Sequence, residues 1–204
     1  MEFYEVINKR RTIRDWIDME VSTEQIERII DAGLAAPSND HMRRWEFILL
    51  HTDEEKERAL QFIAESSKKQ TDSQYIPDDE KTQMCYGYAI PRQYAMFRNA
   101  SFVIIPLFQT IHGIYNVTDL SGLNNFASIW CVIENILLSA TAEGLGASLR
   151  IPTNEESENV RGLLNVPDHY VMPCYIGIGY PDENAKKIQQ HIYHAKEKMH
   201  YGNW

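Results

Sequence analysis

The spacing of apolar residues separates helices from strands along this chain. After residue 22, apolar side chains recur at helical intervals and predict an amphipathic helix with one buried face. These positions are Ile26, Ile29, Ile30, Gly33 and Leu34. Ser22 and Gln25 form a capping box before them, and Pro37 prevents the helix from continuing. The pattern therefore predicts both ends of this helix.

Two more capping boxes indicate where helices begin further along the chain. Residues 52–55 and 153–156 each start with Thr and end with Glu, so that side chains and backbone N–H groups can satisfy each other. We expect helices from these points through about Lys68 and about Leu164.

Apolar spacing alone predicts two other helices. A short amphipathic helix spans residues 2–9, with Phe3, Val6 and Ile7 on one side. A long helix spans residues 126–143 and is apolar on most faces, so other elements must cover it. Gly144 suits its C-terminal cap.

Short apolar and β-branched runs predict three strands, at residues 45–50, 100–105 and 170–180. Pro106 has no amide hydrogen, so we expect the second strand to end there or to lie at an edge.

Residues 69–99 are polar and poorly periodic, and we expect loops and one or two helices over the surface. Such a segment often forms a lid. Its aromatic side chains either line a substrate opening or pack locally. They are Tyr75, Tyr86, Tyr88, Tyr94 and Phe97.

Composition limits the class of protein. With 204 residues, 44% of them hydrophobic, the chain can form one domain with a proper core. Its net charge of -9 disfavours a nucleic-acid partner. We find no secretory signal and no apolar run long enough to cross a bilayer, and we expect a soluble cytoplasmic protein. The widely spaced Cys85, Cys131 and Cys174 predict reduced, mostly buried thiols.

Three guanidinium groups and a hydroxyl lie within five residues, at Arg10, Arg11, Thr12 and Arg14. Arg keeps its charge and offers forked donors that suit phosphate oxygens, so this cation cluster favours an anionic ligand. The simpler alternative is a solvated charged face.

Three later motifs follow the cation cluster in a fixed order. The first is the Pro37-Ser38-Asn39 turn before Trp45, and the others are Gly-Leu-Gly-Ala-Ser at residues 144–148 and Ile-Gly-Ile-Gly-Tyr-Pro at residues 176–181. Together they cover nearly the whole chain, and their order resembles the FMN-dependent nitroreductase family. We find no Ser-His-Asp set, nucleophilic cysteine motif or Gly-x-Gly-x-x-Gly loop that points elsewhere.

The resemblance implies an α+β fold, in which helices flank a central mixed, mainly antiparallel sheet, and an intertwined homodimer. The chain would form a single FMN-binding domain over residues 1–204. Residues 183–204 would be a C-terminal extension that packs on the partner subunit, because the apolar side chains of the tail would otherwise be poorly hidden.

The resemblance also implies the cofactor site. The phosphate, ribityl chain and pyrimidine side of FMN would lie against Arg10, Arg11, Thr12 and Arg14. The residues that reach the flavin from the other subunit would be Pro37, Ser38, Asn39 and His41. The segment that passes flavin N5 would be Leu149, Arg150 and Ile151. Positive charge at Arg14 would stabilise the reduced flavin. No metal and no general acid are assigned.

The implied activity is that of an FMN-dependent oxidoreductase with a ping-pong mechanism. NAD(P)H would reduce the flavin and leave, and an electron-poor acceptor such as a nitroaromatic or a quinone would then take its place.

The turn departs from the family pattern at three positions, because His41 stands for Asn, Arg43 for Gln and Arg44 for Pro. A His at this place also occurs in the iodotyrosine deiodinase branch, so a reductive dehalogenase-like flavoprotein is an alternative. A non-catalytic flavin-binding protein and a helical interaction module are two others. The basic residue that completes the phosphate site stays open among Lys186, Lys187 and His191.

Overall fold

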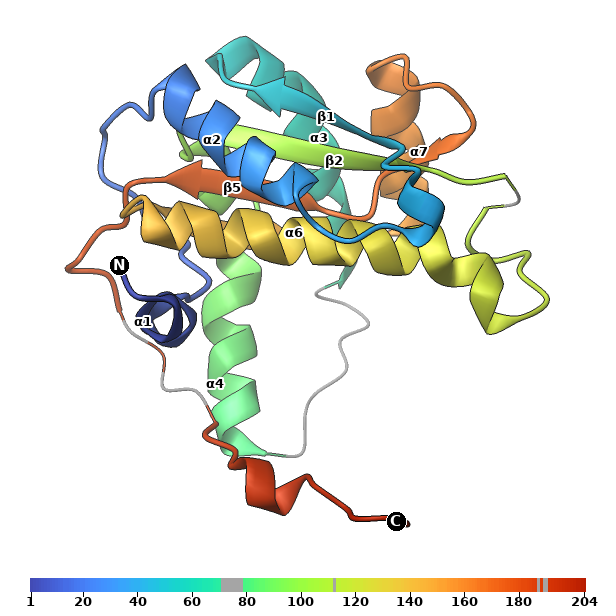
Figure 1. The fold of residues 1–204 in the computed structure, drawn as a ribbon. Coiled ribbons are helices and arrows are strands. Elements are labelled where there is room, and N and C mark those ends of the chain that lie inside the picture. Colours follow the sequence, from blue (N-terminus) through green and yellow to red (C-terminus); the bar gives the residue numbers. More distant parts are fainter. Residues whose placement is uncertain (71–78, 112, 187, 189–190) are drawn as a thin grey trace.

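One sheet organises the protein. The computed structural model describes residues 1–70, 79–111, 113–186, 188 and 191–204. Within them the sheet has the strand order β1-β2-β5-β3, and β4 pairs with the end of β2. Figure 1 shows β1, β2 and β5 of this sheet side by side. The strands are β1 (Trp45–Leu50), β2 (Phe102–Gln109), β3 (Gly146–Arg150), β4 (Tyr170–Val171) and β5 (Tyr175–Gly179).

Helices connect and cover these strands. The α-helices are α1 (Phe3–Lys9), α2 (Thr23–Leu34), α3 (Asp53–Gln70), α4 (Glu80–Ala89), α5 (Ala95–Arg98), α6 (Asn124–Ala142) and α7 (Asn154–Leu163). Short 3-10 helices are η1 (Asn39–His41), η2 (Ile90–Arg92), η3 (Leu120–Leu123) and η4 (Ala195–Glu197).

The ladders between the described strands are all antiparallel, whereas an isolated bridge between Thr12 and Ala147 is parallel. The predicted α+β architecture, with helices flanking a mainly antiparallel sheet, is therefore confirmed. The intertwined homodimer stays a prediction.

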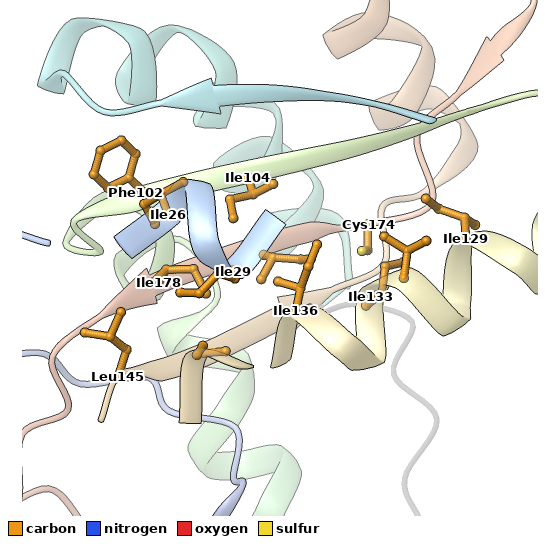
Figure 2. Close-up of a cluster of buried hydrophobic side chains, with 14 of the residues drawn as sticks. Ile26, Ile29, Phe102, Ile104, Ile129, Ile133, Ile136, Leu145, Cys174 and Ile178 are labelled. Carbon is orange, nitrogen blue, oxygen red and sulfur yellow. The ribbon is translucent and has the colours of Figure 1, made fainter. Parts of the chain in front are cut away.

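Strand β2 is buried on both faces, which explains its almost continuous apolar sequence. Alternate side chains point to opposite faces of a strand. Phe102, Ile104 and Phe108 belong to the core that α2 and α6 cover. Val103, Ile105 and Leu107 belong to a second core that includes residues of α3. Figure 2 shows the first core, where isoleucines of α2 and α6 gather beside the sheet.

The helix ends follow the predicted caps. The Ser22 hydroxyl accepts a hydrogen bond from the Gln25 N–H, and the Gln25 side chain accepts one from the Ser22 N–H. Thr52 and Glu55 make the same reciprocal contacts before α3. Gly144 has a φ of 79° just after α6, which is the left-handed conformation expected at a C-terminal cap.

Two predictions about strand ends are wrong. Pro106 lies inside β2, which continues to Gln109. The Gln109 N–H faces β1, where it donates to a carbonyl, so the ring nitrogen of Pro106 faces the opposite side by the alternation of a strand. On that side β5 pairs with residues 102–104 of β2, and β4 pairs with β2 only from Phe108 onward. Pro106 lies between these two paired regions, so no neighbouring strand among the described residues needs the N–H that it lacks. The predicted strand at residues 170–180 is split into β4 and β5 before and after Pro173.

Burial differs from expectation in α1 and at the cysteines. Val6 is buried, but Phe3 on the same helix is 64% exposed. All three cysteines are free, as predicted, but Cys131 is exposed, Cys85 is half-buried and only Cys174 is buried.

One described segment, Leu120–Ala142, is long and apolar enough to cross a membrane by length and composition alone, so the expectation that no stretch qualifies is wrong. Its helix α6 packs against α2 and β2 and contributes Ile129, Ile133 and Ile136 to the first core. Core helices pass the same test, so the segment is weak support for a membrane span.

The tail extends away from the sheet, below α4 in Figure 1. Its large apolar side chains are exposed, and Trp204 is 100% exposed. These residues are Ile192, Tyr193, Met199, Tyr201 and Trp204. Their packing on a partner subunit stays a prediction.

Candidate functional site

A cavity of about 890 Å³, which we call the first cavity, lies between four parts of the chain. They are the N-terminal segment 8–15, helix α4 with the turn after it, the end of β3 and the described residues of 181–188. Of the expected cofactor residues, the structure brings together Arg11, Thr12, Arg14, Leu149, Arg150 and Ile151.

The guanidinium of Arg14 has a hydrogen-bond donor without an acceptor among the described residues. This donor, Nε, is buried. Burial lowers the pKa of this guanidinium below its ordinary value, although Tyr88 and Asp15 oppose that shift. A buried donor on a cation is costly when it has no partner, so the position favours a bound anionic or electron-rich group.

Strand β3 fixes the position of this segment. The Ile13 N–H donates to the Ala147 carbonyl at 2.8 Å. The two chains approach closely because Gly146 has no side chain, and a Cβ there would lie 2.7 Å from Cγ1 of Ile13. Arg14 is thereby held beside the end of the strand.

Other cations surround the first cavity. Arg11 is exposed and its Nη1 donates to the carbonyls of Asn8 and Arg10, at 2.8 and 2.6 Å. Arg10 itself does not line the first cavity. Lys186 lines it from the C-terminal segment. Two other basic residues were considered for the phosphate site. Nε2 of His191 lies 3.4 Å from Oδ1 of Asp79, and Lys187 falls outside the described residues.

Helix α4 is joined to the N-terminal segment by Asp15, Tyr88 and Arg92. The Tyr88 hydroxyl donates to the Asp15 carboxylate. Nε of Arg92 lies 3.5 Å from Oδ1 of Asp15, and the guanidinium lies 4.0 Å from the centre of the Tyr88 ring. Burial, and then the bond to Asp15, raise the pKa of Tyr88, so the phenol keeps its proton at neutral pH.

The aromatic residues of the predicted lid segment lie in different environments. Tyr86 and Tyr88 line the first cavity. Phe97 is buried in the second core, and Tyr94 packs against that core. Tyr75 lies outside the described residues. Local packing is therefore confirmed for Phe97 and Tyr94, and a substrate opening lined by Tyr86 and Tyr88 stays a prediction.

Arg150 lines the first cavity but is paired within the protein. Its Nη1 donates to the Glu156 carboxylate, and its Nε donates to Oε1 of Gln93 at 2.9 Å. The sequence predicted that Glu156 would complete a capping box with Thr153. The Thr153 hydroxyl accepts from the Glu156 N–H, which confirms that half of the box, and the Glu156 carboxylate also pairs with Arg150.

The Pro37-Ser38-Asn39 turn lies against the N-terminal part of α6. The Asn39 N–H donates to the Ser128 hydroxyl at 3.1 Å, and the Asn124 amide donates to Oδ1 of Asn39 at 3.3 Å. The Ser38 hydroxyl oxygen is buried without a partner among the described residues. None of Pro37, Ser38, Asn39 and His41 lines the first cavity of its own chain.

Backbone strain is concentrated just after this turn. Asp40, His41 and Arg43 have φ values of 51°, 53° and 45°. Residues with side chains seldom adopt this left-handed conformation, and such strain is often found at functional sites.

A second cavity, of about 760 Å³, lies between α6 and α7. Phe126 and Trp130 contribute aromatic walls, and Ile151 lines both cavities. Ile151 is 62% exposed, so the residue that the two cavities share is accessible to solvent.

The residues that hydrogen-bond to the side chains of the site were not identified from the sequence. Asp15 directly follows the cation cluster, and this proximity could have indicated it. Gln93 and Glu156 lie 57 and 6 residues from the Arg150 that they bind, and no local pattern pairs them with it.

The structure thus combines an antiparallel α+β fold with a cavity at the end of β3 that Arg11, Arg14 and Lys186 line. The family model described as "Nitroreductase family" matches residues 7–180. The chain belongs to the nitroreductase family, which confirms the resemblance seen in the sequence.

Relatives within the family carry different names. A Methanothermobacter thermautotrophicus protein, provisionally named NADH dehydrogenase/NAD(P)H nitroreductase, is 31% identical over 191 residues, which are 90% of this chain and 80% of that protein. Mouse iodotyrosine deiodinase 1 is 26% identical over 190 residues, and the match spans 90% of this chain but 64% of the mouse protein.

A solved structure shares the fold. Oxidised iodotyrosine deiodinase bound to FMN and 3-iodo-L-tyrosine superimposes with a TM-score of 0.74 at 16% identity, and the match covers 100% of both chains.

Proposed function

We propose that this protein is an FMN-dependent oxidoreductase that takes electrons from NAD(P)H and passes them to an electron-poor small molecule, such as a nitroaromatic or a quinone. The observation that carries the proposal is Arg14, a guanidinium with a buried, unpartnered Nε inside a cavity of about 890 Å³. Family membership supports a flavin as the ligand, and so does the FMN named in the deiodinase structure of the same fold.

The residues of the first cavity suit FMN. Arg11 and Lys186 offer cationic donors to a phosphate, and Thr12 offers a hydroxyl. Three carboxylates also line the cavity, those of Asp15, Asp182 and Glu183, and Asp15 adds little repulsion because Tyr88 and Arg92 already contact its carboxylate. The volume falls within the roughly 300–1,000 Å³ typical of small-ligand sites.

The chain would position and tune the cofactor. When bound, FMN supplies a two-electron carrier that accepts hydride from a nicotinamide and gives it to an acceptor. Positive charge on Arg14 would favour the reduced state, because that state carries additional negative charge. Tyr86 and Tyr88 would form a wall that orients planar ligands and limits the access of water.

We also infer that a second copy completes each site. The buried Ser38 hydroxyl and the strained turn lie away from the first cavity of their own chain, so Pro37, Ser38, Asn39 and His41 would serve the partner's cofactor. The same homodimer would cover the extension at residues 183–204, whose exposed apolar side chains otherwise meet water.

Anaerobic stopped-flow of the FMN-loaded protein tests the activity. We expect NADH or NADPH to bleach the flavin, and a nitroaromatic or quinone to restore its colour in a separate phase. A flavin that is bleached by dithionite but by neither nicotinamide would contradict the proposed reductase and favour a non-catalytic flavin-binding protein or the alternative below.

The alternative is reductive dehalogenation. Two observations favour it: the 26% identity to mouse iodotyrosine deiodinase 1 and the two tyrosines of α4 that face the first cavity, where they could contact a halophenol. Dithionite-reduced protein that reoxidises rapidly with a halophenol but slowly with nitroaromatics and quinones would support this alternative over the first.

A further inference from the structure

We propose that the buried ion pair between Arg150 and Glu156 sets the electrostatic potential that the first cavity presents to its cofactor. Glu156 thereby keeps the reduction potential of the bound flavin lower than Arg150 alone would make it. This inference rests on the proposed function, since it concerns the flavin in that cavity. Arg150 and Glu156 are tuning and positioning residues in this account, and neither carries a proton or an electron.

The inference rests on which of the two charges, that of Arg150 or that of Glu156, lies nearer to the first cavity. The side chains of Arg150 and Glu156 are only 5% and 1% exposed. Arg150 and Gln93 line the first cavity, whereas Glu156 does not. Because its acceptor Gln93 also lines the cavity, we place the guanidinium on the cavity side of the carboxylate. A ligand in the cavity meets the positive end of the pair first, and the negative end reduces its effect from behind.

The surroundings keep this pair in a single arrangement. Gln93 accepts from Nε of Arg150 at 2.9 Å, which fixes the guanidinium at the base of the α4 wall. The Glu156 carboxylate lies in the first turn of α7, where the helix dipole favours negative charge. Burial and then the charge of Glu156 raise the pKa of Tyr175, so that phenol stays neutral and adds no charge of its own.

Stability alone does not account for such a pair. Apolar residues of similar volume usually stabilise a core as well as a buried ion pair does, because the pair first loses the hydration of both charges. An electrostatic role at the cavity wall gives the pair an effect that apolar residues could not reproduce.

Substitutions that make the pair more positive or more negative distinguish this electrostatic role from a role in packing. Glu156→Gln keeps the shape and an acceptor for Arg150 but removes the negative charge, so the cavity becomes more positive. Reduced FMN should then bind about tenfold more tightly relative to oxidised FMN, the scale of one unit charge at ~10 Å in an effective dielectric of ~20. Arg150→Met removes the positive end and should shift the preference the other way.

The test is a potentiometric titration of FMN-loaded wild type, Glu156→Gln, Arg150→Met and the double variant Arg150→Met/Glu156→Met. We expect a raised midpoint potential for E156Q, a lowered one for R150M and an intermediate one for the double variant, whose site is neutral. Loss of packing would not move the two single variants in opposite directions.

Two negative results can be told apart. FMN-loaded E156Q and R150M that both keep the wild-type potential overturn this inference and leave the proposed function standing. A wild-type protein that binds no FMN overturns the proposed function itself, and this inference with it.

Discussion

The phenol of Tyr88 donates a hydrogen bond to the carboxylate of Asp15, and this contact joins helix α4 to the segment that carries the cation cluster. Arg92 pairs with the same carboxylate and lies over the Tyr88 ring. The three side chains connect two walls of the first cavity, so the wall formed by α4 depends on a contact remote in sequence.

Replacing Tyr88 by Phe should destabilise the protein, because the Asp15 carboxylate loses a donor. We expect a loss on the order of 1.5 kcal/mol, the low end for hydrogen bonds to charged groups, in urea denaturation. Tyr86→Phe is the matched control, since Tyr86 is exposed on the same helix, and it should change stability by less than about 0.5 kcal/mol. Equal effects of both variants would show that the contact to Asp15 is unimportant.

The same contact predicts a pH dependence at the alkaline end. The pKa of Tyr88 is raised above its ordinary value of 10.0 in the folded state, first by burial and then by Asp15. A group whose folded pKa is raised gives stability that is complete below the unfolded pKa and is lost as pH rises through the folded one. The difference in the free energy of unfolding between wild type and Y88F should stay constant from pH 7 to about pH 10 and become smaller only above that pH. A difference that disappears well below pH 10 would refute this assignment.

Arg14→Met should have opposite effects on binding and on stability. FMN affinity should fall by roughly 10- to 100-fold, the scale of a charged hydrogen bond, as measured by isothermal titration. The unliganded protein should be as stable as wild type or more so, because a buried donor without a partner is removed. Arg58→Met, on the distant α3, should leave FMN affinity unchanged. Unaltered FMN binding by the Arg14 variant would remove the main support for the site.

A mixed dimer tests whether the turn serves the other subunit. Arg14→Met and Ser38→Tyr should each impair both sites of a homodimer. In a two-fold dimer each site would combine Arg14 of one chain with the partner's Ser38. Refolding the two variants together should therefore restore one intact site in each mixed dimer, and FMN binding should rise above that of either variant. No recovery in a mixture proven to contain mixed dimers would place both residues in a site of one chain.

Glu143→Gln should lower the melting temperature at pH 7 and lose that effect in acid. Nε and Nη2 of Arg28 donate to the two carboxylate oxygens of Glu143 at 3.0 and 2.8 Å. This contact lowers the pKa of Glu143 from its ordinary value of 4.5. The stability it gives is present above 4.5 and is lost as pH falls through the lower folded value. The melting temperatures of wild type and E143Q should thus converge as the pH falls below 4.5, while the exposed control Glu158→Gln should follow wild type both at pH 7 and in acid.

Much of the fold could be predicted from the sequence because its determinants are local. Ser22 with Gln25, and Thr52 with Glu55, are near enough in sequence to identify helix starts, and both capping boxes are present. Pro106 was misjudged because its effect depends on which neighbouring strand faces its nitrogen, and only the assembled sheet determines that.

The site was predictable only in part, for the same reason. The cation cluster and the end of β3 are contiguous stretches, and Arg11, Thr12, Arg14 and Arg150 do line one cavity. The partners that give these residues their roles come from elsewhere. Tyr88 reaches Asp15 across 73 residues and Gln93 reaches Arg150 across 57, distances at which no residue pattern specifies a contact.

Sedimentation velocity of the purified protein after incubation with FMN tests the central claim most directly, when protein and flavin absorbance are followed together. The account predicts one boundary near twice the 23.7 kDa of a single chain, with one flavin per chain moving in it, and loss of that flavin in Arg14→Met. A wild-type boundary at the mass of one chain, with all of the flavin left behind in solution, would contradict it.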